Sequence, residues 1–143
     1  MSDTYLQNLE VQRQRTEQGY ATRNAFTLAT LNMRTDTRDT LREALRVRNE
    51  DITDVRQQLQ NLHPRGTSTH PALQTIELTN RLHALINARN QIHDQLDDVN
   101  VLVTKITNER NNERLAYENR IHHLDYMRFK HIFSHEENII NPS

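Results

Sequence analysis

The sequence has 143 residues, a hydrophobic content of 34%, an aromatic content of 5% and a net charge of −1 at pH 7. A chain of this length corresponds to one domain, and its low apolar content is below that of compact globular proteins, so we expect it to bury little alone and to associate. The balanced charge gives no general attraction to nucleic acid or anionic membranes, and the lack of cysteine excludes disulfides, thiolate catalysis and cysteine-based zinc sites.

The sequence contains no signal-peptide hydrophobic segment and no apolar run of membrane-spanning length. We therefore expect a protein that is not secreted and does not cross a membrane, located in the cytoplasm or within a viral or other particle. Leucine, isoleucine and valine recur at helical spacing throughout the chain, which argues against disorder.

The first predicted arm covers about residues 3–62. Ser2 or Asp3 can cap a helix that begins near Thr4. Gly19 is a weak point, because glycine costs about 1 kcal/mol relative to alanine inside a helix. The segment 40–43 matches a capping box, so the helix could restart there, but the absence of Gly and Pro favours a continuous helix. A heptad pattern then runs from Leu41 to Leu62.

The segment 63–71 is the predicted hinge between two arms. It holds two of the three prolines and one of the two glycines in the chain, so it is the one place where a helix is clearly interrupted.

The second predicted arm covers about residues 71–136, with His70 as its N-cap and Pro71 in the first helical position. Its apolar residues keep a 3-4 repeat from Leu78 to Ile106, and segment 108–114 contains no apolar residue. We expect the helix to end between His135 and Asn138. The tail, 137–143, is then either a docking peptide or a loose end.

Together these elements predict an all-α fold and a single helical domain, formed by a long, antiparallel, coiled-coil-like helical hairpin. In this hairpin, residues in contact should have numbers that add to about 134, because that register pairs apolar with apolar positions and sets the weak point at 19–24 opposite the polar segment 110–114. The alternative is a four-helix bundle, which would form if both arms break, near 35–40 and 108–112.

A row of arginines at i, i+4 spacing falls opposite three aspartates in this register. We predict inter-arm ion pairs among Arg34, Arg38, Arg42, Asp94, Asp97 and Asp98. The alternative is a phosphate-binding stripe that also includes Arg46, and it is disfavoured because acidic residues lie on both sides of the row.

All seven aromatic residues lie in the half of the hairpin away from the hinge. Large aromatic side chains are favoured at protein interfaces, so we predict that this open end docks to copies of the chain or to a partner. The predicted interface consists of Tyr5, Leu9, Tyr20, Phe26, Tyr117, Leu124, Met127, Phe129, Ile132 and Phe133. The alternative is that these side chains form the core of the monomer.

No arrangement of residues indicates catalysis. His131 and His135 have a spacing that would let two imidazoles share a metal, but no Glu-x-x-His motif accompanies them, so packed or solvent-facing histidines are favoured. The serines lack a Gly-flanked elbow, and the two glycines stand too far apart for a phosphate-binding loop. We expect no catalytic residues, no cofactor and no metal, and therefore no enzyme.

The sequence predicts a non-enzymatic structural or assembly subunit. It would form homo-oligomers, and bind other protein subunits of a larger complex such as a virion, a tail or a filament. Two alternatives are a nucleic-acid-packaging protein that uses the arginine row and a regulatory adaptor that pairs its coiled-coil helices with another protein.

Overall fold

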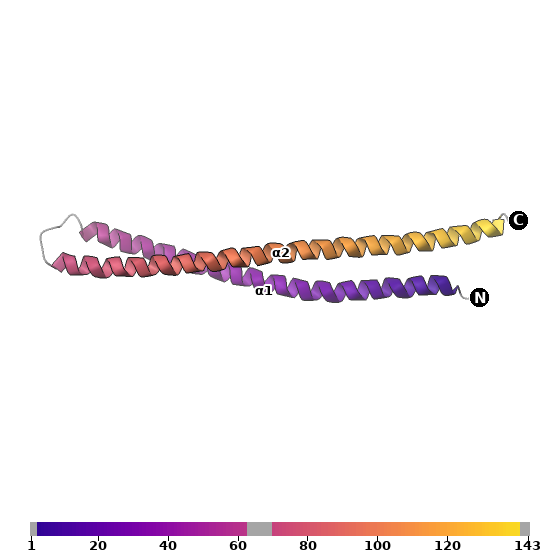
Figure 1. Ribbon diagram of the computed structural model, residues 1–143, viewed down its shortest axis with the longest axis horizontal. Coiled ribbons are helices and arrows are strands. Elements are labelled where there is room, and N and C mark those ends of the chain that lie inside the picture. The colour runs from indigo at the N-terminus through magenta and orange to yellow at the C-terminus, as the bar shows by residue number, and fades with distance from the viewer. Residues whose placement is uncertain (1–2, 63–69, 141–143) are drawn as a thin grey trace. The chain divides into compact units, whose positions relative to one another are not determined.

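The computed structural model describes residues 3–62 and 70–140, except the side chains of residues 70–72 and 135–140. These residues form two helices, α1 (Thr4–Leu62) and α2 (His70–Ile140), which pack against each other as a helical hairpin (Figure 1). No strand occurs in the two described ranges. The predicted all-α hairpin is therefore confirmed. Residues 63–69 of the predicted hinge lie outside the described residues.

The start of α1 is capped by Asp3. Its carboxylate oxygen Oδ1 accepts hydrogen bonds from the backbone N–H groups of Tyr5, at 3.0 Å, and Leu6, at 3.3 Å. The Asp3 backbone carbonyl accepts the first helical hydrogen bond, from the N–H of Gln7 at 3.1 Å. These bonds satisfy amide groups that have no partner within the helix, and they confirm the predicted start near Thr4.

Both helices are continuous at the two places where the sequence allowed a break. At the suspected capping box, the Thr40 hydroxyl does not cap a new helix but donates to the carbonyl of Asp36 at 3.0 Å. Other threonines of α1 make the same bond to a carbonyl three or four residues earlier, which satisfies their hydroxyl groups inside a helix. Since α2 also runs unbroken through 108–114, the four-helix alternative is not adopted.

The end of α2 differs from the prediction. The helix continues to Ile140, so residues 137–140 belong to α2 rather than to a tail. No Gly or Pro lies between Pro71 and Ile140, so no residue of this type interrupts the helix before its described end. Residues 141–143 lie outside the described part of the chain.

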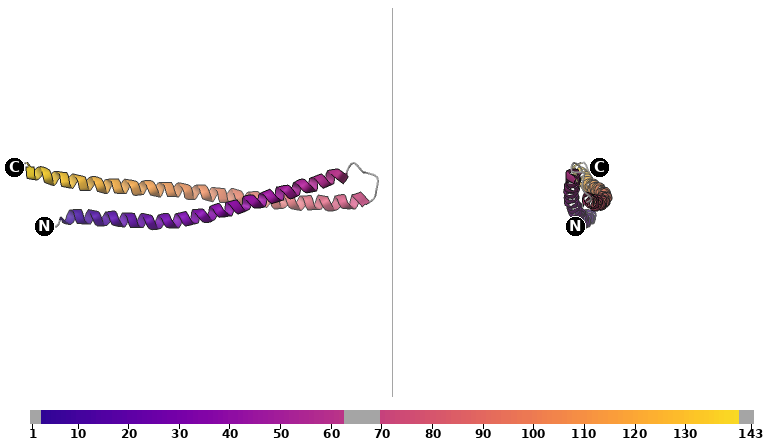
Figure 2. Two further views of the ribbon diagram at one scale, coloured as in Figure 1. Left: turned by 180° about the vertical axis from the view of Figure 1, so that it is seen from behind. Right: turned by 90° about the vertical axis from the view of Figure 1, so that its left-hand side faces the viewer.

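The chain divides into two units, which we describe separately. The open-end unit comprises Met1–Leu31 and Lys105–Ser143, and the hinge-end unit comprises Asn32–Thr104. Each unit contains a part of α1 and a part of α2, as the colours in Figure 2 allow the reader to follow.

In the open-end unit the two helices meet along a narrow seam of side chains. Leu9 of α1 and Ile121 and Leu124 of α2 are buried in this seam. Hydrogen bonds across it join Asn24 to Arg110 and Gln12 to Arg120, pairs whose residue numbers add to 134 and 132. The predicted register of about 134 is therefore confirmed in this unit.

The hinge-end unit has a similarly thin core. Ile52 and Val55 of α1 are each 2% exposed, and Val99 of α2 is 7% exposed. With the three seam residues of the open-end unit, these are the only buried apolar side chains in the described part of the chain. Neither helix, over its described residues, contains a stretch long and apolar enough to cross a membrane.

Gly19 lies inside α1, and a methyl group at this position would have room. An added Cβ would meet only the end of the flexible Arg23 side chain, at 3.4 Å. We expect Gly19→Ala to stabilise the chain by about 0.5–1 kcal/mol, because alanine loses less backbone entropy in a helix. Urea unfolding followed by far-UV circular dichroism measures this change. The matched control is Ala21→Gly at an exposed position of the same helix, and equal stability of both variants would contradict the prediction.

Candidate docking surface

One face of α2 in the open-end unit carries exposed large side chains. Tyr126, Phe129 and Phe133 are 59%, 66% and 56% exposed, and the rings of Phe129 and Phe133 stack with their centroids 6.0 Å apart. This face is opposite the seam, because Phe133 lies nine residues, or two and a half helical turns, beyond the buried Leu124. It is therefore the side of α2 that α1 does not cover.

The same face extends toward the amino terminus of α2 at 3-4 spacing. Leu115, Asn119 and His122 occupy the preceding positions of the repeat, and all three are exposed. We name the complete set the α2 outer stripe: Leu115, Asn119, His122, Tyr126, Phe129 and Phe133. The predicted interface lacked the first three and Tyr126, because sequence reasoning followed a single apolar repeat in α2. The signal was a second 3-4 repeat, shifted by two residues from the seam residues Leu124 and Ile121.

Four residues of the predicted interface lie in the seam instead. Leu9 and Leu124 are 6% and 3% exposed, so both belong to the core of the hairpin. Tyr20 and Tyr117 are half-buried, and their rings stack across the seam at 4.3 Å with an angle of 7° between planes. The interface prediction is corrected for these four residues, because their side chains already pack within the chain.

The other predicted interface residues fall outside both groups. Met127 and Ile132 are half-buried on α2. Phe26 is 73% exposed, but it lies on α1. Tyr5 is 39% exposed, and its ring contacts that of His131 of α2 in a tilted arrangement, with centroids 4.4 Å apart. Of the ten residues predicted for the interface, only Phe129 and Phe133 lie on the α2 outer stripe.

Asp3, Tyr5 and His131 form a clasp between the start of α1 and the last part of α2. Nε2 of His131 lies 2.7 Å from Oδ2 of Asp3, while the other carboxylate oxygen caps α1. The pKa of Asp3 is lowered, chiefly by the hydrogen bond from His131, with smaller effects from the backbone N–H groups and the imidazole charge. One carboxylate thus serves as helix cap and inter-helix contact.

A polar layer interrupts the seam between Gly19 and Asn24 on α1 and residues 110–113 on α2. Arg110 donates to the amide oxygen of Asn24 at 3.3 Å. Nε of Arg110 and Oε2 of Glu113 are buried without a hydrogen-bond partner among the described residues. A buried polar atom without a hydrogen-bond partner destabilises a helix pair. A polar layer in the seam also disfavours other registers, because a shift would set its polar side chains against apolar ones.

The predicted inter-arm ion pairs do not form between the described helices. Arg46 instead contacts Glu43, at 2.6 Å, and Glu50, and Arg38 lies 4.0 Å from Asp39, all within α1. Arg34, Arg42, Asp94, Asp97 and Asp98 are exposed and form no ion pair within 4.0 Å among the described residues. The reason is that an i, i+4 row rotates about 40° around the helix at each step, so only part of the row can face α2.

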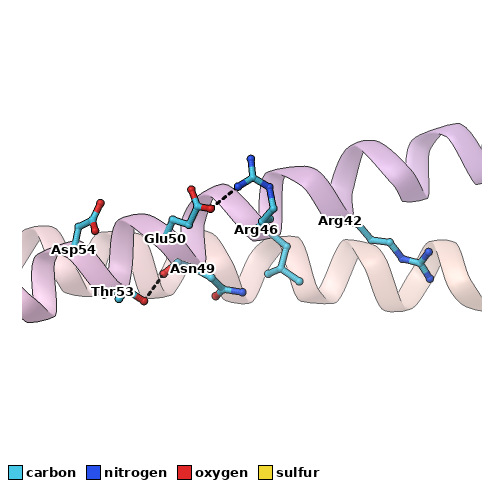
Figure 3. Close-up of a pocket in the computed structure, with 7 residues that line it drawn as sticks. Arg42, Arg46, Asn49, Glu50, Thr53 and Asp54 are labelled. Atoms are coloured by element: carbon cyan, nitrogen blue, oxygen red, sulfur yellow. Dashed lines mark hydrogen bonds and ion pairs between the residues drawn. The ribbon is translucent and has the colours of Figure 1, made fainter.

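A groove of about 550 Å³ lies beside this arginine row. It is lined by residues of α1 alone: Arg42, Leu45, Arg46, Asn49, Glu50, Thr53 and Asp54. Figure 3 shows the Arg46 guanidinium directed at Glu50, with Arg42 pointing away from both. The pKa of Glu43 is lowered by its hydrogen bond from Arg46 and then by the charge of that residue. Arg46, the last cation of the row, is therefore paired with acidic residues of its own helix.

The described residues contain no group of three His, Asp or Glu side chains that could hold a metal ion. Of the two histidines considered as ligands, His131 contacts Asp3, and the side chain of His135 lies outside the described part of the chain.

Comparison with known proteins provides no further information on function. The chain matches no protein-family model, no curated protein and no solved structure.

The Asp3 clasp predicts an acid-dependent loss of stability. Because the pKa of Asp3 is lower in the folded state than its unfolded value of about 3.9, its contribution is complete above that value and is lost as the pH falls below it. We expect Asp3→Asn, which keeps a capping oxygen, to melt a few degrees below the unchanged protein at pH 5.5, and this difference to shrink as the pH falls below about 3.9. Asp3→Ala, which also removes the cap, should melt lowest at pH 5.5. A difference between wild type and Asp3→Asn that does not shrink as the pH falls below about 3.9 would contradict this interpretation.

The polar layer predicts opposite effects of single and double substitution. Asn24→Leu should destabilise the chain by about 1–3 kcal/mol, because it leaves Arg110 in the seam without its acceptor. Asn24→Leu combined with Arg110→Leu should stabilise it by about 1 kcal/mol or more, since an apolar layer replaces the polar one. Urea unfolding of these two variants and of Arg110→Leu alone measures the changes, and simple additivity of the two single substitutions would contradict the coupling.

Proposed function

We propose that this chain is a non-enzymatic structural subunit that self-associates through its exposed aromatic surface. In this way it builds or joins a larger protein assembly, such as a virion, a tail or a filament. The observation that carries the proposal is the α2 outer stripe, where Tyr126, Phe129 and Phe133 are each more than half exposed. Contiguous exposed apolar patches on a protein surface mark interaction sites, and aromatic residues are enriched in them.

The thin core supports association for an energetic reason. Only six apolar side chains in the described part of the chain are buried, and a further helix against α2 would bury aromatic surface that water now contacts. The net charge of −1 adds little long-range repulsion between copies near neutral pH.

The nucleic-acid alternative has weaker support. Arginines outside the row also pair with acidic side chains of the same chain, as Arg13 does with Glu17 and Asp125, and Arg114 with Glu118. Phosphate binding requires cations that are free to replace counterions along the nucleic acid. These pairs reduce the positive charge available for that purpose.

Light scattering coupled to size exclusion tests the proposed function on untagged protein near physiological salt. We expect a species heavier than the 16.9 kDa monomer, with the absorbance ratio at 260 and 280 nm of pure protein. A monomer throughout the accessible concentration range would contradict self-association. A high 260/280 ratio that disappears in strong salt would favour the nucleic-acid alternative.

The aromatic stripe predicts the effect of removing its rings. Phe129→Ser combined with Phe133→Ser should raise the dissociation constant of the assembly by about 100-fold or more. The reason is that both rings are largely exposed in the single chain and would be buried between copies on association. Far-UV helicity should be retained, since neither ring lies in the seam. The matched control is Phe26→Ser, an exposed aromatic residue on α1, which should leave the mass unchanged. Loss of helicity in the double variant would instead assign these rings to the monomer core.

A further inference from the structure

The α2 outer stripe has the spacing of a coiled-coil heptad. Written as heptad positions, Asn119, Tyr126 and Phe133 occupy position a, and the remaining stripe residues, Leu115, His122 and Phe129, occupy position d. All six side chains are exposed. A second helix that packs on this face would therefore meet it with the geometry of a two-stranded coiled coil.

The residues on one side of this stripe are acidic, and those on the other side are basic. On one side, in position g, lie Glu118 and Asp125, and on the other, in position e, lie His123 and Lys130. In a parallel pair of helices, position g of one helix meets position e of the other, whereas in an antiparallel pair g meets g and e meets e. A parallel pair of identical α2 helices would thus bring acidic side chains against basic ones, and an antiparallel pair would bring like charges together.

The spacing along the helix also matches. In a parallel, in-register pair, a g residue meets the e residue five positions further along its partner. Asp125 then faces Lys130 of the second copy, and Glu118 faces His123 of the second copy. Both contacts occur twice, because the two helices are identical.

Asn119 provides a second argument for this orientation. An asparagine at a single a position fixes register and oligomer state in parallel coiled coils, where it can bond to the same residue of the partner helix. A shift of one heptad would instead place Asn119 of one copy opposite the ring of Tyr126 of the other.

From these observations we infer that the α2 outer stripe binds the same stripe of a second copy of this chain, as a parallel, in-register pair of α2 helices. This inference rests on the proposed self-association and specifies its partner and orientation. At about 200 Å² for each aromatic side chain, the exposed parts of Tyr126, Phe129 and Phe133 contribute roughly 360 Å² of the approximately 800 Å² that a standard interface buries on each partner. The rest of the stripe and the charged residues beside it supply further area.

The packing within the chain does not obstruct this pairing. The stripe faces away from the seam, so α1 of the open-end unit does not obstruct a second α2. Asp125 contacts Arg13, and Glu118 contacts Arg114 at 3.2 Å, but their side chains remain 50% and 44% exposed. Each carboxylate can therefore meet a second cation.

A charge exchange tests the orientation on the full chain. Lys130→Glu and Asp125→Lys should each weaken the homodimer about tenfold, because each places like charges opposite one another at two symmetric contacts. An equimolar mixture of the two variants should associate about as tightly as the unchanged chain, since every contact in the mixed pair again joins opposite charges. Sedimentation equilibrium measures the dissociation constants. Arg13→Ala is the control for the seam contact that Asp125→Lys also removes, and it should leave dimerisation unchanged.

A single introduced cysteine tests the register, because the chain itself contains none. Asn119→Cys should form a disulfide-linked dimer in a glutathione redox buffer, since the two a positions face each other. Ser134→Cys, at an exposed b position outside the stripe, should remain largely a thiol under the same conditions.

The outcomes separate this inference from the proposed function. An oligomer in which the mixture of charge variants recovers no affinity, or in which both cysteine variants cross-link equally, would overturn the parallel pairing and leave self-association standing. A chain that stays monomeric would overturn both.

Discussion

Two helices that pack only on each other can bury one stripe of each, and this constraint governs the rest of the structure. A third of the residues are hydrophobic, yet only a few lie on the shared seam. In the open-end unit the buried side chains of Leu9, Ile121 and Leu124 hold the helices together, while large side chains on the outer face of α2, such as Phe129 and Phe133, face water. Helix continuity follows from the same constraint, because a seam this narrow stabilises the pair only when it runs through many turns.

The seam contains polar as well as apolar side chains, and the polar ones help to fix the register of the two helices. Threonine hydroxyls in α1 bond to carbonyls of the preceding turn, which lets these residues occupy a long helix without an unsatisfied group. At the polar layer, Asn24 and Arg110 bond across the seam. Such a layer contributes less stability than apolar residues would. It favours one register, however, because a shift of the helices would separate Asn24 from Arg110. The contact between Asp3 and His131 favours the same register at the start of α1.

The face of α2 opposite the seam differs in residue composition from an ordinary solvated helix surface. Charged residues would be the ordinary occupants, whereas Tyr126, Phe129 and Phe133 are exposed there in two helical turns. The charges are present, but they lie beside the stripe, acidic on one side and basic on the other. An apolar stripe with acidic residues on one side and basic residues on the other is the arrangement by which coiled-coil helices select a partner and an orientation.

The sequence by itself determined the all-α hairpin, the capped start of α1 and the register of the open-end unit. Those features depend on local propensity and on a periodic pattern that can be counted along the chain, from Asp3 at the cap to the polar segment opposite Gly19. Only the tertiary structure decided which large side chains remain exposed, because Tyr20 and Phe26 have similar surroundings in sequence but lie on different faces of α1. It also decided the partners of the arginines. An i, i+4 row turns gradually around its helix, so Arg46 meets Glu43 and Glu50 of the same helix before it can reach an aspartate of α2.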